Sequence, residues 1–116
     1  MIGTRMNSKI VIAAGLLLLP QTPSFAQSIP KYDVEKHCNE VAGFGGTYSQ
    51  MIFNGCIQQE QSAYDDLKVE WSAIPDQIQR HCDEVASFGG AGTYMILQGC
   101  IAQEMQAGSN REGFKF

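Results

Sequence analysis

The sequence predicts an all-α fold made of two tandem helical hairpins, with four helices in all and each hairpin held by a disulfide. Three observations predict it: an internal match at a fixed offset of 44 residues, apolar residues that recur every three or four positions, and four cysteines placed equally in the two matching segments. A fixed internal period of this kind indicates a duplicated supersecondary unit. Apolar recurrence at that spacing is typical of amphipathic helices.

The internal match pairs residues 37–60 with residues 81–104 without a gap, and 15 of the 24 positions are identical. Both segments open with His-Cys, continue to Phe-Gly-Gly, and end with Gly-Cys-Ile and Gln-Glu. We therefore expect one helical domain over residues 27–107 that contains two repeats, over 31–71 and 75–107.

The four expected helices cover residues 31–44, 48–71, 75–88 and 93–107. The apolar positions that indicate the first and third helices are Val34, Cys38, Val41 and Phe44, and Ile78, Cys82, Val85 and Phe88. The inward candidates on the longest helix, the second, are Ile52, Cys56, Ala63, Leu67 and Trp71.

Local signals mark where these helices begin and end. The glycine pairs Gly45-Gly46 and Gly89-Gly90 are expected to stop the first and third helices, because glycine readily adopts the left-handed backbone conformation. Thr47 with Gln50 offers a capping box for the second helix, and Thr93 is the counterpart cap for the fourth. Pro75 suits the first turn of the third helix, where its missing N–H costs nothing.

The four cysteines form an even set in a short chain, which favours a disulfide framework. Cys38 precedes the end of its expected helix by about as much as Cys56 follows the start of the next, so both lie roughly 9–12 Å from the turn. An antiparallel hairpin brings them level, and the same holds for Cys82 and Cys100. The favoured pairs are therefore Cys38–Cys56 and Cys82–Cys100. Each disulfide closes a short loop and is expected to stabilise the folded state by about 3 kcal/mol. Pairing across the repeats, Cys38–Cys82 with Cys56–Cys100, remains the alternative.

Residues 1–26 are expected to be a signal peptide rather than part of the fold. Arg5 and Lys9 precede an apolar run over 10–19, which is too short for a bilayer span of roughly 20 residues. Small residues at Ser24 and Ala26 suit a cleavage before Gln27. We therefore expect a periplasmic or secreted protein with no membrane span, and residues 108–116 are expected to form a flexible tail.

Charge excludes one class of partner. The chain carries 8 basic and 12 acidic residues, and removal of the basic residues Arg5 and Lys9 with the signal peptide leaves a net charge of −6. The protein therefore lacks the basic surface that contacts with nucleic-acid phosphates need. The expected partner is a protein or an envelope component.

The residues that could carry catalysis do not form a recognisable constellation. Cys-x-x-Cys, a nucleophile elbow and a phosphate-binding glycine loop are all absent. The paired carboxylates Glu40 with Glu84 and Glu60 with Glu104 fit solvated helix faces. We therefore expect no enzyme and no cofactor.

A metal site is an alternative, since His37-Cys38 and His81-Cys82 together offer two imidazoles and two thiolates. Adjacent residues of a helix point about 100° apart, so neither pair chelates as a unit, and exported thiols become oxidised. Surface histidines beside structural disulfides are the favoured interpretation, with no metal ligands assigned.

Four aromatic residues are candidates for contact with a partner, because they belong to segments found in one repeat only: Tyr64, Trp71, Phe114 and Phe116. Aromatic side chains often anchor interfaces. Trp71 could instead pack in the core, and the tail with its two phenylalanines could be a frayed terminus. A further alternative is a duplicated site around Phe44 and Phe88.

The stretch from Cys56 to Leu67, followed by Trp71 and Arg80-His81-Cys82, resembles the small exported lysozyme-inhibitor family of the LprI type. The resemblance covers about 27 residues; Lys68 replaces the family's Asn, and the spacer before the Trp is shorter. The whole chain also looks like small uncharacterised exported proteins of proteobacteria, a resemblance that implies no activity. The main prediction is a non-catalytic binding protein, and the LprI resemblance implies inhibition of a cell-wall hydrolase as an alternative.

Overall fold

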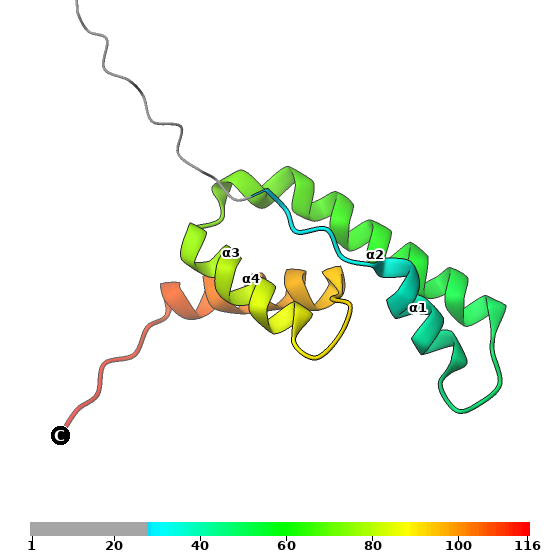
Figure 1. Cartoon of the computed structure of the whole chain (residues 1–116). Helices are drawn as coiled ribbons and strands as arrows, with labels where there is room; N and C mark the ends of the chain where they lie inside the picture. Colours follow the sequence, from blue (N-terminus) through cyan, green and yellow to red (C-terminus); the bar gives the residue numbers. More distant parts are fainter. Residues whose placement is uncertain (1–27) are drawn as a thin grey trace, which may run out of the picture.

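The computed structural model describes residues 28–116, and the expected signal peptide lies outside these residues. The described residues form four α-helices and no strand: α1 (Val34–Gly43), α2 (Gln50–Glu70), α3 (Asp76–Ser87) and α4 (Tyr94–Ser109), with a short 3-10 turn, η1 (Trp71–Ala73), after α2. The all-α prediction is confirmed (Figure 1).

The helices pair into two hairpins, which we call the first hairpin (α1 and α2) and the second hairpin (α3 and α4). A disulfide joins Cys38 to Cys56 in the first and another joins Cys82 to Cys100 in the second, with Cα atoms 5.6 and 5.5 Å apart. The favoured connectivity is thus confirmed over pairing across the hairpins. Each bond ties two helices at the same depth from their turn.

The core lies where the second half of α2 packs on the second hairpin. Leu67 of α2 and Leu97 of α4 are fully buried there. The buried residues of this cluster are Ala63, Leu67, Trp71, Ile74, Cys82, Ala86, Tyr94, Leu97 and Ile101. By contrast, α1 packs on α2 alone, so the first hairpin extends beyond the core (Figure 1).

All four helices begin one to three residues later than expected, and the difference is largest at α1 and α2. Helix α1 begins at Val34 rather than residue 31, because the Asp33 side chain accepts a hydrogen bond from the Lys36 backbone N–H at 3.1 Å. The cap of α2 is Ser49, whose Oγ accepts from the N–H of Ile52 at 3.2 Å, so the expected capping box at Thr47 is wrong. Serine and aspartate both satisfy otherwise unpaired first-turn N–H groups.

Residues 28–33 form an extended segment that runs alongside α2 to the start of α1 (Figure 1). The Tyr94 hydroxyl donates to the Pro30 carbonyl at 2.7 Å and accepts from the Tyr32 N–H at 3.0 Å. The Tyr32 hydroxyl donates to Asp83 at 2.8 Å. This segment was expected to be helical in part, and its anchoring to α3 and α4 explains why it is not.

Several residues expected to face inward are exposed. In α1 the inward positions are Cys38 and Ala42, which are one helical turn apart, so Val41 lies partly outside. Ile52 of α2 is also half exposed. Phe44 and Phe88 lie just beyond α1 and α3 with extended backbone, and their side chains leave the helical face altogether.

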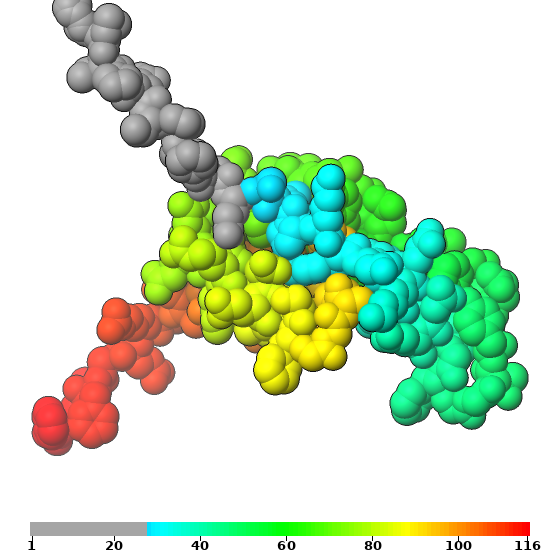
Figure 2. Space-filling model, in the orientation of Figure 1, coloured from blue at the N-terminus to red at the C-terminus, as the bar shows by residue number. Residues whose placement is uncertain are grey.

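The helix ends agree only partly with the expected glycine stops. Gly45, Gly46 and Gly89 have positive φ, whereas in the second turn the other left-handed residue is Gly92 rather than Gly90. At the other end of the hairpin, α4 continues to Ser109, beyond the expected end at 107, and the remaining residues point away from the helices (Figure 2).

Candidate functional site

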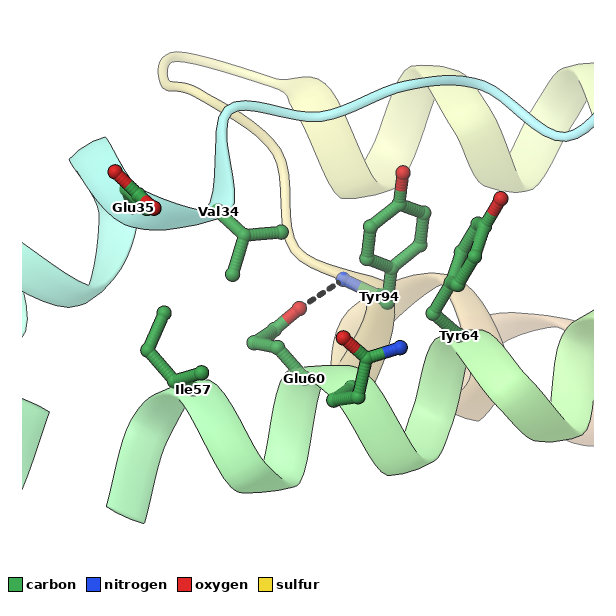
Figure 3. Close-up of a pocket in the computed structure, with 7 residues that line it drawn as sticks. Val34, Glu35, Ile57, Glu60, Tyr64 and Tyr94 are labelled. Atoms are coloured by element: carbon green, nitrogen blue, oxygen red, sulfur yellow. Dashed lines mark hydrogen bonds between the residues drawn. The ribbon is translucent and has the colours of Figure 1, made fainter. Parts of the chain in front are cut away.

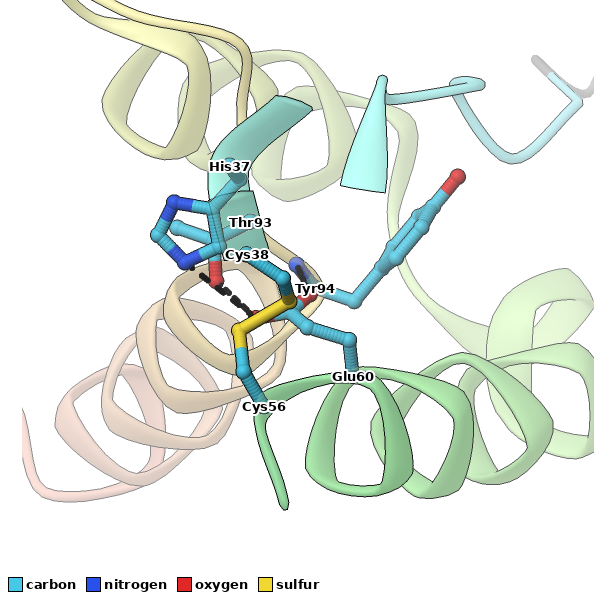
Figure 4. A network of polar contacts seen from close by, with 6 residues as sticks. All are labelled: His37, Cys38, Cys56, Glu60, Thr93 and Tyr94. Atoms are coloured by element: carbon cyan, nitrogen blue, oxygen red, sulfur yellow. Dashed lines mark hydrogen bonds and ion pairs between the residues drawn. A yellow bond between two sulfur atoms is a disulfide. The ribbon is translucent and has the colours of Figure 1, made fainter. Parts of the chain in front are cut away.

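Glu60 stands at the junction of the two hairpins. Its side chain leaves α2 and is buried, with only 2 % of the residue exposed. The Thr93 hydroxyl donates to Oε1, and the Tyr94 backbone N–H donates to Oε2 at 2.6 Å. His37 Nε2 lies 3.9 Å from Oε1 (Figure 4).

This arrangement caps α4 with a side chain from another helix. Thr93 occupies the N-cap position but makes no capping bond within α4. A carboxylate is favourable there, because it accepts from first-turn N–H groups and complements the positive end of the helix dipole. Glu60 was expected on a solvated face; that expectation is wrong, because docking of the second hairpin covers it.

Tyr94, whose backbone N–H donates to Glu60, packs against two other tyrosines. The Tyr94 ring centroid lies 4.7 Å from that of Tyr32 and 4.8 Å from that of Tyr64. Burial raises the pKa of both Tyr32 and Tyr94, and the hydrogen bond from the Tyr32 hydroxyl to the Asp83 carboxylate raises the pKa of Tyr32 further. These phenols are therefore held in their neutral form.

A hollow of about 280 Å³ opens beside Tyr64, Tyr94 and Glu60 (Figure 3). Val34 and Ile57 supply its apolar wall. Both oxygens of its buried carboxylate already accept hydrogen bonds from α4 and the residue before it. Glu60 therefore acts here as a structural acceptor that joins the hairpins.

Each hairpin carries a groove, and the two grooves correspond at the 44-residue offset. The first groove is lined by His37, Val41, Ile52, Gly55, Cys56, Gln59 and Glu60, together with Thr93, Met95 and Ile96. The second groove is lined by His81, Val85, Ile96, Gly99, Cys100, Gln103 and Glu104. Every residue of the second groove has an identical counterpart in the first. The difference is that α4 and the preceding threonine border the first groove.

The hairpin tips also correspond. Phe44 and Phe88 are 90 % and 91 % exposed, with nearly equal backbone angles of φ −64°, ψ 130° and φ −63°, ψ 119°. The same two turn hydrogen bonds hold them: the Phe N–H donates to a valine carbonyl three residues back, and the second glycine N–H donates three residues back in turn. Both tips lie toward the same side of the molecule (Figure 1).

The four candidate contact residues are not brought together. Trp71 is buried in the core, which corrects its expected role as a contact residue and agrees with the alternative of core packing. Tyr64 is half buried against Tyr94, with Lys68 Nζ 5.1 Å from its ring centroid. Phe114 and Phe116 are exposed and contact each other edge to face.

The histidines and cysteines of the metal alternative do not form a set of metal ligands in the described residues. All four cysteines are in disulfides, so no thiolate lies beside either histidine. His81 Nε2 instead lies 3.6 Å from Glu104 Oε1, and His37 Nε2 lies 3.9 Å from Glu60 Oε1. Within residues 28–116, no group of three or more His, Cys, Asp or Glu side chains could hold a metal ion.

Sequence reasoning missed the roles of Glu60, Tyr32 and Tyr94. A signal was present, because Tyr94 interrupts the internal match: the corresponding residue of the first segment is Gln50. Positions where one segment alone carries a large aromatic residue mark contacts that only one hairpin makes.

No protein-family model, curated protein or solved structure matches this chain. In the part of the chain that the structure describes, no helix is both long enough and apolar enough to cross a membrane. The grooves, the tips and the hairpin junction are therefore the features on which a functional assignment rests.

Proposed function

We propose that the protein is a small exported, non-catalytic binding protein that presents two equal contact sites, one at each hairpin tip. The carrying observation is the exposure of Phe44 and Phe88, about nine-tenths each, on turns of the same geometry. An exposed aromatic side chain on an ordered turn loses little conformational entropy on binding, and aromatic residues are enriched among energetic anchors of interfaces.

Two equal sites on one chain favour a partner that repeats or is itself multivalent. When the first tip binds, the second is held at a high effective concentration, so two weak contacts can give tight binding. A multimeric protein or a repetitive envelope component fits this requirement. The two disulfides support a periplasmic or secreted location, because such bonds persist in oxidising compartments.

The test is photo-crosslinking in cells, with a photoreactive phenylalanine analogue at position 44 or 88. We expect both positions to give an adduct with the same partner. The same analogue at Ser62, an exposed residue on α2, is the matched control and should give none. Adducts that differ between the tips, or none at either tip, would contradict the proposal. A third variant at Phe116 tests whether the tail contributes.

Inhibition of a cell-wall hydrolase is a second candidate, favoured by the excess of 12 acidic over 6 basic residues among positions 28–116. Lysozyme-type hydrolases that are basic would be attracted to such a surface, and the attraction would weaken with salt. Turnover of cell-wall substrate by a basic lysozyme should then slow at micromolar protein. Unchanged turnover at low ionic strength would remove this candidate.

A further inference from the structure

The groove of the first hairpin is bordered by the start of α4, whereas the matching groove of the second hairpin is lined by α3 and α4 alone. In the first groove, Thr93, Met95 and Ile96 lie against the side that carries His37 and Glu60. Nothing from another hairpin lines the second groove, although all its residues are the same.

The surface of the second hairpin beside its groove is open, whereas the matching surface of the first hairpin is covered by the core packing. Ala63 of α2 is buried in the core, but its counterpart Ala107 on α4 is exposed. A hollow of about 660 Å³ lies against Ala107, Glu104 and Ile78. The carboxylate of Glu104 is about half exposed, while that of Glu60 is almost fully buried.

We infer that this second groove binds the first hairpin of another copy of the same chain, by the contact that already joins the two hairpins within one chain. The inserting element is the start of α2, since its sequence repeats the start of α4. Ser49 stands for Thr93 and keeps the hydroxyl, and Met51-Ile52 repeats Met95-Ile96. Met51 is 80 % exposed and Ile52 46 %, so both are accessible.

Charge complements this docking. The first turn of α2 carries no acidic residue, and its N–H groups form the positive end of the helix dipole. Glu104 supplies the acceptor that Glu60 supplies within the chain. The Ser49 hydroxyl and the Gln50 N–H of the second copy take the positions of the Thr93 and Tyr94 donors.

Where the two hairpins differ in sequence, a change in the groove is matched by a change in the inserting helix. Tyr94 needs the rings of Tyr32 and Tyr64, whose counterparts in the second hairpin are Asp76 and Gly108. A groove without these rings needs no tyrosine on the inserting helix, and the first hairpin has Gln50 there.

One further difference weakens the contact between copies relative to the contact within a chain. The counterpart of the buried Leu67 is Arg111, which removes apolar area from the interface. We therefore expect weak, concentration-dependent association. Because groove and inserting helix lie on different hairpins, the contact is head to tail, and it forms rings or open chains of copies.

The test is sedimentation velocity of the purified, oxidised protein over a concentration series, with two variants that block opposite sides of the contact. Glu104→Lys blocks the groove, and Met51→Lys blocks the inserting helix. The Glu104 side chain is 46 % exposed and Met51 is 80 % exposed in the single chain, so both variants should fold with two disulfides. Circular dichroism and intact mass check this.

We expect the unchanged protein to assemble beyond dimers with concentration, and each variant alone to remain monomeric. An equimolar mixture of the variants should form a dimer and stop there, because the free Met51 helix of one fits the intact Glu104 groove of the other. A protein that stays monomeric up to about 1 mM, so that any dissociation constant lies above this concentration, overturns the inference. So does association that survives in either variant, or a mixture that stays monomeric.

This result is separable from that of the proposed function. Phe88 remains exposed although its hairpin is docked within the chain, so Phe44 should also lie outside the contact between copies. A Phe44→Ser, Phe88→Ser variant should therefore lose its partner while it assembles as before. Loss of self-assembly in that variant would contradict the docking geometry.

Discussion

The hydroxyl of Thr93, at the start of α4, donates a hydrogen bond to the carboxylate of Glu60 on α2, 33 residues earlier in the chain. Glu60 also accepts from the Tyr94 N–H at 2.6 Å. One hairpin thus caps a helix of the other, and the cap fixes how the hairpins dock. The matching carboxylate, Glu104, has no such helix start within the described chain to accept from.

Removal of the Glu60 carboxylate should destabilise the fold. We expect Glu60→Ala to lower the free energy of unfolding by about 3 kcal/mol, because two buried donors lose a charged acceptor. Glu104→Ala is the matched control and should cost less than about 0.5 kcal/mol, as is usual for exposed residues. Urea unfolding at low protein concentration measures both. Equal losses in the two variants would show that burial of Glu60 contributes nothing.

The raised pKa of Tyr32 leads us to expect that the folded protein loses stability at alkaline pH. Burial and the hydrogen bond to Asp83 raise its pKa in the folded protein above the ordinary value of about 10. Its stabilising contribution is therefore complete below pH 10 and is lost as the pH rises from there toward the folded pKa, because only the unfolded state ionises readily.

The variant Tyr32→Phe isolates this effect. At pH 7 it should be less stable than the unchanged protein by about 1 kcal/mol, the usual worth of one hydrogen bond. At pH 11 the difference should shrink, because the unchanged protein alone carries the ionisation of this phenol. Urea unfolding at both pH values checks it, and a difference that is constant with pH would refute the assignment.

Gly92 should not tolerate a side chain. Its φ is +91°, and a Cβ placed there would overlap the ring of Tyr32. We expect Gly92→Ala to cost about 2 kcal/mol, as left-handed strain and the displaced ring predict. The control is Gly55→Ala, inside α2 with open space around it, which should gain up to about 1 kcal/mol. Thermal unfolding of both variants should therefore shift in opposite directions.

The disulfides and the helical hairpins could be predicted because they depend on short-range geometry. The positions of Cys38 and Cys56 relative to one turn are set by helix rise alone. The first residue of α2 was harder to predict, because Thr47 and Ser49 are both good N-cap residues and the local sequence does not distinguish between them.

The asymmetry of the two hairpins could not be predicted from local patterns. Glu60 and Glu104 occupy matching positions, yet one is buried and the other half exposed. The contact between Tyr32 and Tyr94 joins residues 62 positions apart. Periodicity identifies the apolar side of a helix, but the hairpin that packs on that side is determined by tertiary contacts between residues far apart in the sequence.

That asymmetry gives the last prediction, which compares matching residues of the two hairpins. Leu97 is fully buried in the core, whereas its counterpart Phe53 in α2 is only partly buried. Leu97→Ala should cost about 3 kcal/mol, since it removes apolar contacts and leaves a cavity. Phe53→Ala should cost less, about 2 kcal/mol, although more atoms are deleted, because part of the Phe53 side chain is already accessible to water. Chemical denaturation measures both, and a larger loss at Phe53 would place the core in the first hairpin instead.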